Sequence, residues 1–497
     1  MTNTFAPIVA TSQGAVRGRR EEHATVFRHI PYAAPPRGAA RFAPPVPHPP
    51  WDGVRDATAA GPTAPQPGRD AFGDLDMSPY FGQGWVPGED YLAVNVWTPD
   101  TTRDDLPVMV FVHGGGFVAG STRSALYDGT GFARDGVVLV TLNYRLGVPG
   151  FLHLPDAPDN RGLLDVIAAL RWVEESIAAF GGDRSRVTLF GQSAGATIVG
   201  AVVADPRAEG LFQRAIIQSG NGLGAFTPAQ ADRVTQALAR ILGTAPTAEA
   251  LASVPDERLV EAMPQLAGID LNIDGHFDPL IGLSPFSLVL DQQPAEAVAT
   301  GRGAGVDLLL GTNAEEGNLY LVPLGHLASS TEEDVHAVAA RSHPAPQKLV
   351  EVYRRERPGA SAGELRSAIM ADALFGAGTR RLATAHAQHP SSRTHVYEFA
   401  WRSRALDGRL GATHVMELPF VFDRTDLPRL HGPEAILGPA EPPAGLASRV
   451  HATWIRFART GDPGWPPYES VRRTTMRIAE AWTRVADPSA PIRRAWE

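Results

Sequence analysis

The chain has 497 residues, of which 43% are hydrophobic and 20% are charged, as in a globular protein with a large buried core. Its formal net charge is −9, acidic and basic residues are interspersed, and no lysine- or arginine-rich block is present, which argues against nucleic acid as a partner. The absence of cysteine excludes disulfides, thiolate metal sites and thiol catalysis.

The first residues, MTNTFAPIVATSQGAVRG, lack the basic and apolar regions of a secretory signal peptide. No run of about 18 apolar residues predicts a transmembrane helix. We therefore expect a cytoplasmic protein without a membrane partner.

Residues 31–67 are rich in proline, which disfavours both helix and inner strand. A disordered linker would have this composition. However, Tyr32, Phe42 and Trp51 are interleaved with the prolines. We predict an ordered segment that these aromatic side chains fix to the surface of the core.

Strand and helix signals alternate after this segment. Apolar runs predict strands at 106–115, 136–145, 186–192, 214–220, 306–312 and 394–401. The apolar spacing of residues 162–180 predicts a helix that ends at Gly181. This alternation is typical of the α/β class with a mainly parallel, doubly wound sheet.

Two later segments, 226–270 and 331–390, are more polar and have helical patterns. We interpret them as insertions that form pocket walls over the sheet, so that residues 1–497 make a single domain. Near the C-terminus, SRVHATWIRFARTGDPG predicts an amphipathic helix that ends at Gly461.

The stretch RVTLFGQSAGA places Ser193 between two glycines, after a strand pattern and before a run of small residues. This is the G-x-S-x-G pattern of a nucleophile held on a sharp strand-to-helix turn. A Cβ at Gly191 or Gly195 would collide with neighbouring backbone in such a turn. We predict that Ser193 is a catalytic nucleophile rather than part of a structural turn.

A serine nucleophile needs hydrogen-bond donors for the oxyanion that forms on the substrate. The glycine-rich stretch VFVHGGGF follows a predicted strand and can supply them. We predict an oxyanion hole formed by the N–H groups of Gly115, Gly116 and Ala194. His113 is interpreted as a residue that packs the loop, not as the base.

The serine also needs a base and an acid, which follow it along the chain in enzymes with this turn. His414 lies in a glycine-flanked loop ahead of an apolar stretch, where a base could project over the serine. His386, His389 and His395 fall within predicted helix or strand. For the acid, GTNAEEG offers two adjacent glutamates at 315 and 316, and spacing alone does not choose between them.

These motifs resemble the type-B carboxylesterases of the carboxylesterase/cholinesterase family, and among them the bacterial p-nitrobenzyl esterases. The similar stretches run in family order from about residue 8 to 480. They are IPYAAPPRGAARF, PWDGVRDAT, GEDYLAVNVWTP, HGGGF, NYRLGVPGFL, NRGLLD, FGGDRSRVTLFGQSAG, AIIQSG, GTNAEEG, HVMELPFVF and FARTGDP.

The resemblance implies an α/β-hydrolase fold and completes the candidate site. It selects Glu316 as the acid, His414 as the base and Ser219 as a serine that helps to hold both. The chain departs from the family pattern where Tyr91 replaces a disulfide cysteine and Gln192 replaces a glutamate of cholinesterases. Neither departure changes the predicted triad.

The implied activity is hydrolysis of small to medium, largely apolar carboxylic esters through an acyl-enzyme. Alternatives are a specialised detoxifying esterase, an amidase or carbamate hydrolase, and a non-catalytic adhesion or scaffold protein; the intact triad argues against the last. We expect no organic cofactor and no metal, a small-molecule ester as partner, and a monomer. Apolar candidates for the pocket walls are Phe117, Leu283, Phe286, Leu319, Leu321 and Phe375.

Overall fold

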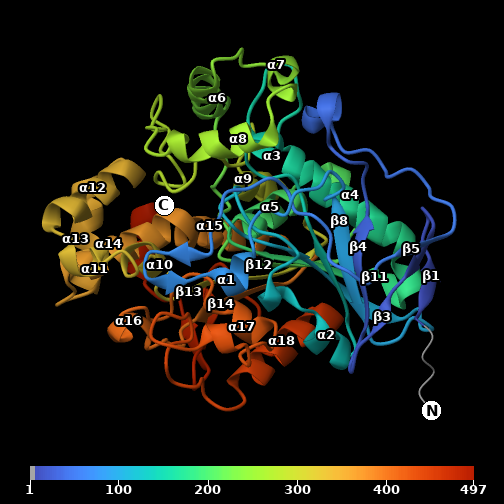
Figure 1. The fold of residues 1–497 in the computed structure, drawn as a ribbon. Coiled ribbons are helices and arrows are strands. Elements are labelled where there is room, and N and C mark those ends of the chain that lie inside the picture. The colour runs from blue at the N-terminus through green and yellow to red at the C-terminus, as the bar shows by residue number, and fades with distance from the viewer. Residues whose placement is uncertain (1–5) are drawn as a thin grey trace.

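The computed structural model describes residues 6–497, which form an 11-stranded sheet between two layers of helices (Figure 1). Two small sheets lie outside it. One is formed by β1 (Ile8–Ala10), β2 (Ala15–Arg17) and β5 (Val54–Asp56), and the other by β6 (Ala71–Phe72) and β7 (Leu75–Asp76). The large sheet has the order β16 (Thr483–Ala486), β15 (Thr474–Ile478), β14 (Thr394–Phe399), β13 (Asp307–Asn313), β12 (Arg214–Gln218), β11 (Gly182–Gln192), β9 (Leu106–Val112), β10 (Val138–Leu142), β8 (Ala93–Thr98), β4 (Thr25–Pro31) and β3 (Arg19–Arg20).

The middle of the sheet, from β10 through β9 to β15, is parallel, and the strands at both ends are antiparallel. Every residue of β9 and β10 is buried, as expected for strands covered on both faces. The predicted doubly wound, mainly parallel sheet is confirmed. Sequence patterns did not predict the antiparallel end strands, of which β3 and β16 are short and largely exposed.

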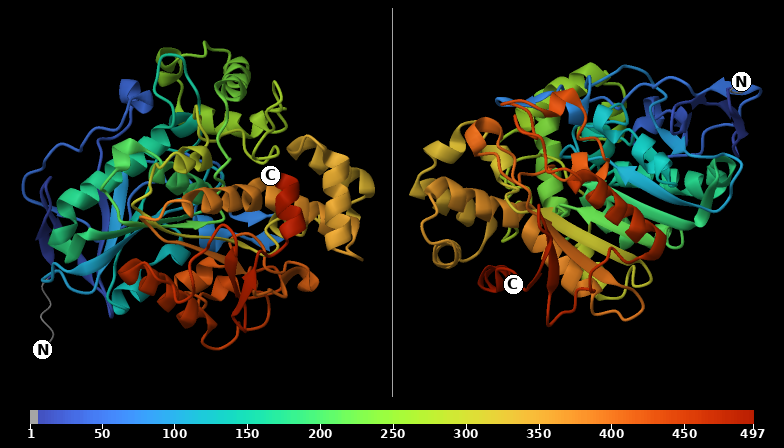
Figure 2. Two further views of the ribbon diagram at one scale, coloured as in Figure 1. Left: turned by 180° about the vertical axis from the view of Figure 1, so that it is seen from behind. Right: turned by 90° about the horizontal axis from the view of Figure 1, so that it is seen from below.

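Helices cover both faces of the sheet (Figures 1 and 2). Side chains of β9 alternate between two hydrophobic clusters: Val110 packs into the cluster that includes α4 and α5, and Phe111 into the one that includes α17 and α18. These covering helices are α4 (Arg161–Ser176), α5 (Ala194–Val203), α17 (Leu418–Val421) and α18 (Leu446–Thr460), the last of which confirms the amphipathic helix predicted near the C-terminus.

Both segments predicted to be helical insertions contain helices. In 226–270 these are α6 (Pro228–Leu242), α7 (Ala248–Ala252) and α8 (Asp256–Ala262). In 331–390 they are α12 (Glu332–Ser342), α13 (Pro346–Glu356), α14 (Ala362–Ala371) and α15 (Ala377–His386). Because α15 contacts β13 and β14, this part of the second segment belongs to the layer that covers the sheet. The single-domain organisation stays a prediction.

The proline-rich segment is fixed to the core by its aromatic side chains, as predicted. Tyr32 and Phe42 are buried, and the Tyr32 hydroxyl donates to the Asn143 carbonyl at 2.7 Å. Trp51 is half-buried, and its indole N–H donates to the Ala15 carbonyl at 3.0 Å.

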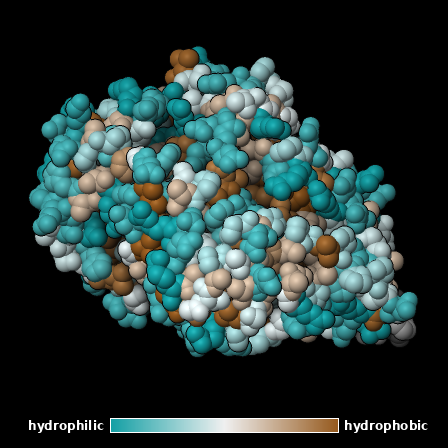
Figure 3. All heavy atoms as spheres, turned by 90° about the horizontal axis from the view of Figure 1, so that it is seen from above, coloured by the Kyte–Doolittle hydropathy of each residue, from teal (hydrophilic) through white to brown (hydrophobic). Residues whose placement is uncertain are grey.

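Polar residues cover most of the face seen in Figure 3, and hydrophobic residues show there as separate small patches. Across residues 6–497, no helix combines the length and the hydropathy that a membrane span requires.

Among the histidines buried outside the predicted site are His386 and His395. His395 lies on β14 between Phe457 and Trp465 and is 1% exposed. His386 ends α15, where its Nδ1 lies 2.7 Å from the Thr394 hydroxyl. Burial lowers the pKa of each imidazole from 6.5 to about 4, because the charged form is poorly solvated there. Both side chains therefore pack in the neutral form, as structural residues.

These low pKa values predict that acid destabilises the fold. Between about pH 6.5 and 4 the unfolded chain binds a proton at His395 that the folded chain does not, so stability falls as the pH falls. His395→Phe removes this difference, and its apparent Tm should fall less than that of the wild type between pH 7.5 and 4.5. His336→Asn, at an exposed position, should follow the wild type. Equal pH dependence of His395→Phe and wild type would contradict the assignment.

Candidate active site

Ser193 stands on the turn between β11 and α5 with φ 57° and ψ −125°, a strained conformation for a residue other than glycine. Its N–H donates to the Gln218 carbonyl at the end of the neighbouring strand β12, at 2.9 Å. Strain held by the surrounding backbone is the feature that the G-x-S-x-G pattern predicted at this position.

The flanking glycines are required by the packing of the turn. A Cβ on Gly195 would lie 2.2 Å from the Val112 carbonyl oxygen and 2.5 Å from that of His113. A Cβ on Gly191 would lie 2.8 Å from the backbone of Gly195. Helix α5 can therefore begin directly against the end of β9 only because these residues have no side chain.

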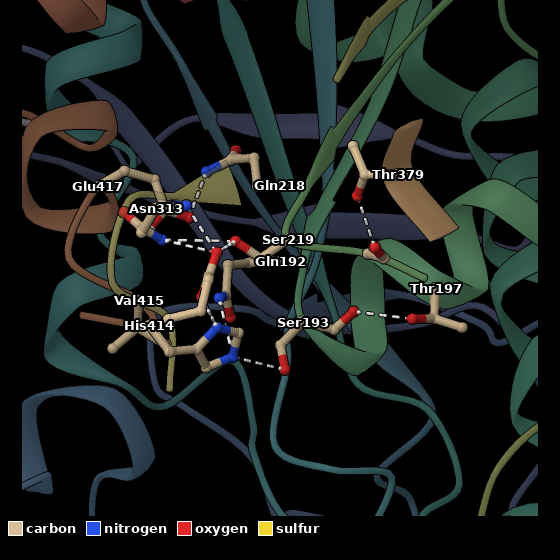
Figure 4. A network of polar contacts seen from close by, with 12 residues as sticks. Gln192, Ser193, Thr197, Gln218, Ser219, Asn313, Thr379, His414, Val415 and Glu417 are labelled. Carbon is tan, nitrogen blue, oxygen red and sulfur yellow. Dashed lines mark hydrogen bonds and ion pairs between the residues drawn. The ribbon is translucent and has the colours of Figure 1, made fainter. Parts of the chain in front are cut away.

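The structure brings Ser193, His414 and Glu316 together although they lie far apart in the sequence. Figure 4 shows the His414 imidazole directed at Ser193. His414 Nε2 lies 2.9 Å from Ser193 Oγ, and His414 Nδ1 lies 2.5 Å from Glu316 Oε2. An ionised carboxylate can only accept, so Nδ1 carries the proton and Nε2 can accept from the serine. This orientation suits His414 for the role of base.

The Glu316 carboxylate is 1% exposed and held by several donors. Its Oε1 accepts from the Ser219 hydroxyl at 2.5 Å and from the Asn313 N–H at 2.6 Å. The neighbouring Glu315 points elsewhere: it forms an ion pair with Arg402 and accepts from the Ala412 N–H. The structure thus places Glu316, and not Glu315, against His414.

A second buried carboxyl group lies behind the first. Glu417 accepts from Gln218 Nε2 at 3.1 Å and from Asn313 Nδ2 at 2.7 Å, and Figure 4 shows Asn313 between it and Ser219. Burial raises the pKa of Glu417, and the negative charge of Glu316 raises it further. Sequence reasoning missed Asn313 and Glu417, although both lie within stretches that resemble the family pattern.

Aromatic rings limit the positions open to His414. Phe375 stacks on the imidazole with 4.4 Å between ring centroids and 9° between planes, and Tyr320 lies 5.9 Å away. Phe375 lies in a π-helical turn, Asp372–Gly376, between α14 and α15. Such turns are rare and often occur at functional sites.

The glycine-rich loop after β9 lies beside the serine. A Cβ on Gly114 would be 3.0 Å from Ser193 Cβ, so the loop and the serine are in contact. No backbone carbonyl among residues 6–497 accepts from the N–H of Gly115 or Gly116, and both residues line a cavity together with Ala194. Their roles as oxyanion donors remain predictions.

His113 packs beneath this loop, as the sequence predicted. Its imidazole is buried and stacked on Tyr144, 4.5 Å between centroids, and its Nδ1 lies 2.8 Å from the Gly114 carbonyl. Burial lowers the pKa of His113 to about 4, so the imidazole stays neutral at physiological pH.

A cavity of about 90 Å³ opens above Ser193 and His414, with mainly apolar walls. Four of the predicted wall residues line it: Phe117, Leu283, Leu319 and Phe375. The prediction was wrong for two others, since Phe286 packs in the core cluster around α5 and Leu321 in the cluster of α12–α14. The other apolar and aromatic residues of the wall are Phe72, Met77, Tyr80, Phe81, Tyr127, Leu280, Tyr320, Leu374 and Val415.

Comparison with known proteins agrees with this architecture. The model of the carboxylesterase family matches residues 6–490. A para-nitrobenzyl esterase of Bacillus subtilis (strain 168) is 37% identical over 98% of both chains, and a phenmedipham hydrolase of Pseudarthrobacter oxydans is 33% identical over 97% of this chain and 96% of its own. Among solved structures, a PNB esterase and a carboxylesterase of Geobacillus stearothermophilus each have a TM-score of 0.85 at 34% identity, covering 99% of this chain and 100% of theirs.

The fold is therefore the α/β-hydrolase fold, and the protein is an enzyme of a hydrolytic class. The chain belongs to the carboxylesterase family. The resemblance predicted from its motifs is confirmed.

The packing of the serine turn predicts opposite effects for two glycines of the same helix. Gly195→Ala places a Cβ against backbone carbonyls and should lower the free energy of unfolding by about 3 kcal/mol or prevent folding. Gly200→Ala meets nothing closer than 3.6 Å and should be neutral or stabilising by up to about 1 kcal/mol. Urea unfolding of both variants measures the difference; equal stabilities would show that the close approach at Gly195 is absent.

Proposed function

We propose that this enzyme is a serine carboxylic ester hydrolase in which Ser193, His414 and Glu316 form the catalytic triad. The observation that carries the proposal is the hydrogen-bonded chain from Ser193 Oγ through the imidazole to the buried Glu316 carboxylate. An activated nucleophile, a base and a group that orients the base are the parts that acyl transfer requires.

The proposed reaction has two steps. His414 takes the proton of Ser193 as the hydroxyl attacks the ester carbonyl, and the Gly115, Gly116 and Ala194 amides stabilise the oxyanion. His414 then gives the proton to the departing alcohol, and water repeats the sequence on the acyl-enzyme. Throughout, Glu316 fixes the tautomer of the imidazole and stabilises its charged form.

We propose small to medium, largely apolar esters as substrates, and the shape and lining of the cavity support this proposal. Its walls are mainly aromatic and aliphatic, and it lies directly above the serine. Amides and carbamates are alternative substrates for the same triad, and one relative is named a phenmedipham hydrolase. Turnover of an ester compared with that of its matched anilide and carbamate separates these possibilities.

The nucleophile is tested by Ser193→Ala. We expect ester turnover to fall by several orders of magnitude, because only binding and oxyanion stabilisation remain. The fold should be intact, since alanine fits the same turn. Mass spectrometry of the wild type after treatment with an organophosphonate should show a single adduct on Ser193, and an adduct on a different serine would overturn the assignment.

The role of Glu316 is tested by substitutions at two adjacent positions. Glu316→Gln should lower kcat roughly 10³- to 10⁴-fold, because an amide permits the wrong imidazole tautomer and carries no charge for the imidazolium. Glu315→Gln is the matched control and should cost little activity, since its carboxylate contacts Arg402 and not His414. If Glu315→Gln were the inactive variant, the proposed triad would be wrong.

A further inference from the structure

Arg69 is the one permanently charged side chain among the described residues that line the cavity above Ser193. It lies just after the proline-rich segment and is half-buried. It also borders a second pocket next to the first, so its side chain stands between the two.

The guanidinium of Arg69 is held against the predicted oxyanion loop. Its Nη1 donates to the Gly115 carbonyl at 2.9 Å and lies 3.2 Å from the position of a Cβ on Gly116. Its Cζ lies 5.8 Å from the centroid of the Phe81 ring. The bond to Gly115 uses one of the five N–H donors of the guanidinium.

No carboxylate of residues 6–497 forms an ion pair with Arg69, and none is among the groups that shift its pKa. The acid in the adjoining pocket, Asp278, is already engaged: its two oxygens accept from the N–H groups of Leu280 and Gly282. Burial lowers the pKa of Arg69, because the charged form is less well solvated there than in water.

A cation in mainly apolar surroundings without a counter-ion is costly until an anion joins it. The guanidinium is well suited to a carboxylate, which it binds with two parallel N–H donors. We propose that Arg69 binds an anionic group of the substrate, so that the enzyme prefers esters that carry a carboxylate. This proposal rests on the proposed function of the same site.

The test compares esters that differ only in charge. One pair is monoethyl adipate and its neutral primary amide, with the charge on the acyl side; the other is 4-(acetoxymethyl)benzoate and its amide, with the charge on the alcohol side. The wild type should have the higher kcat/KM for the carboxylate of at least one pair. In Arg69→Gln, which keeps a donor for the Gly115 carbonyl, the carboxylate-to-amide ratio should fall at least about tenfold. Arg69→Lys should keep part of the preference.

A purely structural role of Arg69 in holding the glycine loop predicts a different result. Both members of each pair would then lose kcat/KM in parallel, and an unchanged ratio would overturn the proposal. If the wild type cleaved no ester and Ser193 were not labelled by the organophosphonate, the proposed function itself would fail. If the wild type hydrolysed the ester bond of these compounds through Ser193, but the carboxylate-to-amide ratio of kcat/KM were the same in Arg69→Gln, only the carboxylate preference would be rejected.

Discussion

The close approach of two backbones at the carboxyl end of the central strands is the constraint on which the site depends. Gly191 is paired with Val112 across β11 and β9, and Gly195 lies so near the Val112 carbonyl that no side chain fits between them. Strand pairing therefore sets the distance between the serine turn and the glycine-rich loop. The proposed nucleophile and the proposed oxyanion donors therefore follow directly on two strands of the same hydrogen-bonded ladder.

The buried carboxylate of Glu316 is positioned at the same carboxyl end of the parallel strands. Asn313 ends β13 and donates its N–H to Glu316 and its side-chain amide to Glu417, so one residue organises two buried carboxyl groups. Two negative charges this close disfavour each other, and burial already raises the pKa of Glu417. A shared amide donor offsets part of this cost. Glu316 is therefore held against the imidazole by uncharged donors, the Ser219 hydroxyl and the Asn313 N–H.

The parts that the sequence predicted are those encoded locally. A strand pattern followed by G-x-S-x-G predicted the turn at Ser193, because strand, glycine and helix signals lie within a few residues. His414 lies 98 residues from Glu316 and 221 from Ser193, so no periodicity links them, and the family pattern was needed to select them. Arg69 was missed because it lies in an irregular stretch just after the proline-rich segment, where the sequence gives no indication of side-chain direction. Phe286 was misplaced for a related reason: apolar residues in the irregular segments that connect helices and strands can face either the cavity or the core.

In the proposed mechanism, the residues that react lie at strand ends, and the residues that would select the substrate lie in the segments between strands. Ser193 and Glu316 lie at or just after the ends of central strands, where sheet geometry fixes them. The cavity wall comes instead from connecting segments, which can change without disturbing that geometry. Such a wall lowers the local dielectric constant, and in this environment a single cation has a large effect on what binds. A charged residue in the wall, such as Arg69, can therefore redirect the enzyme toward a different class of ester while the serine, histidine and glutamate keep the same arrangement.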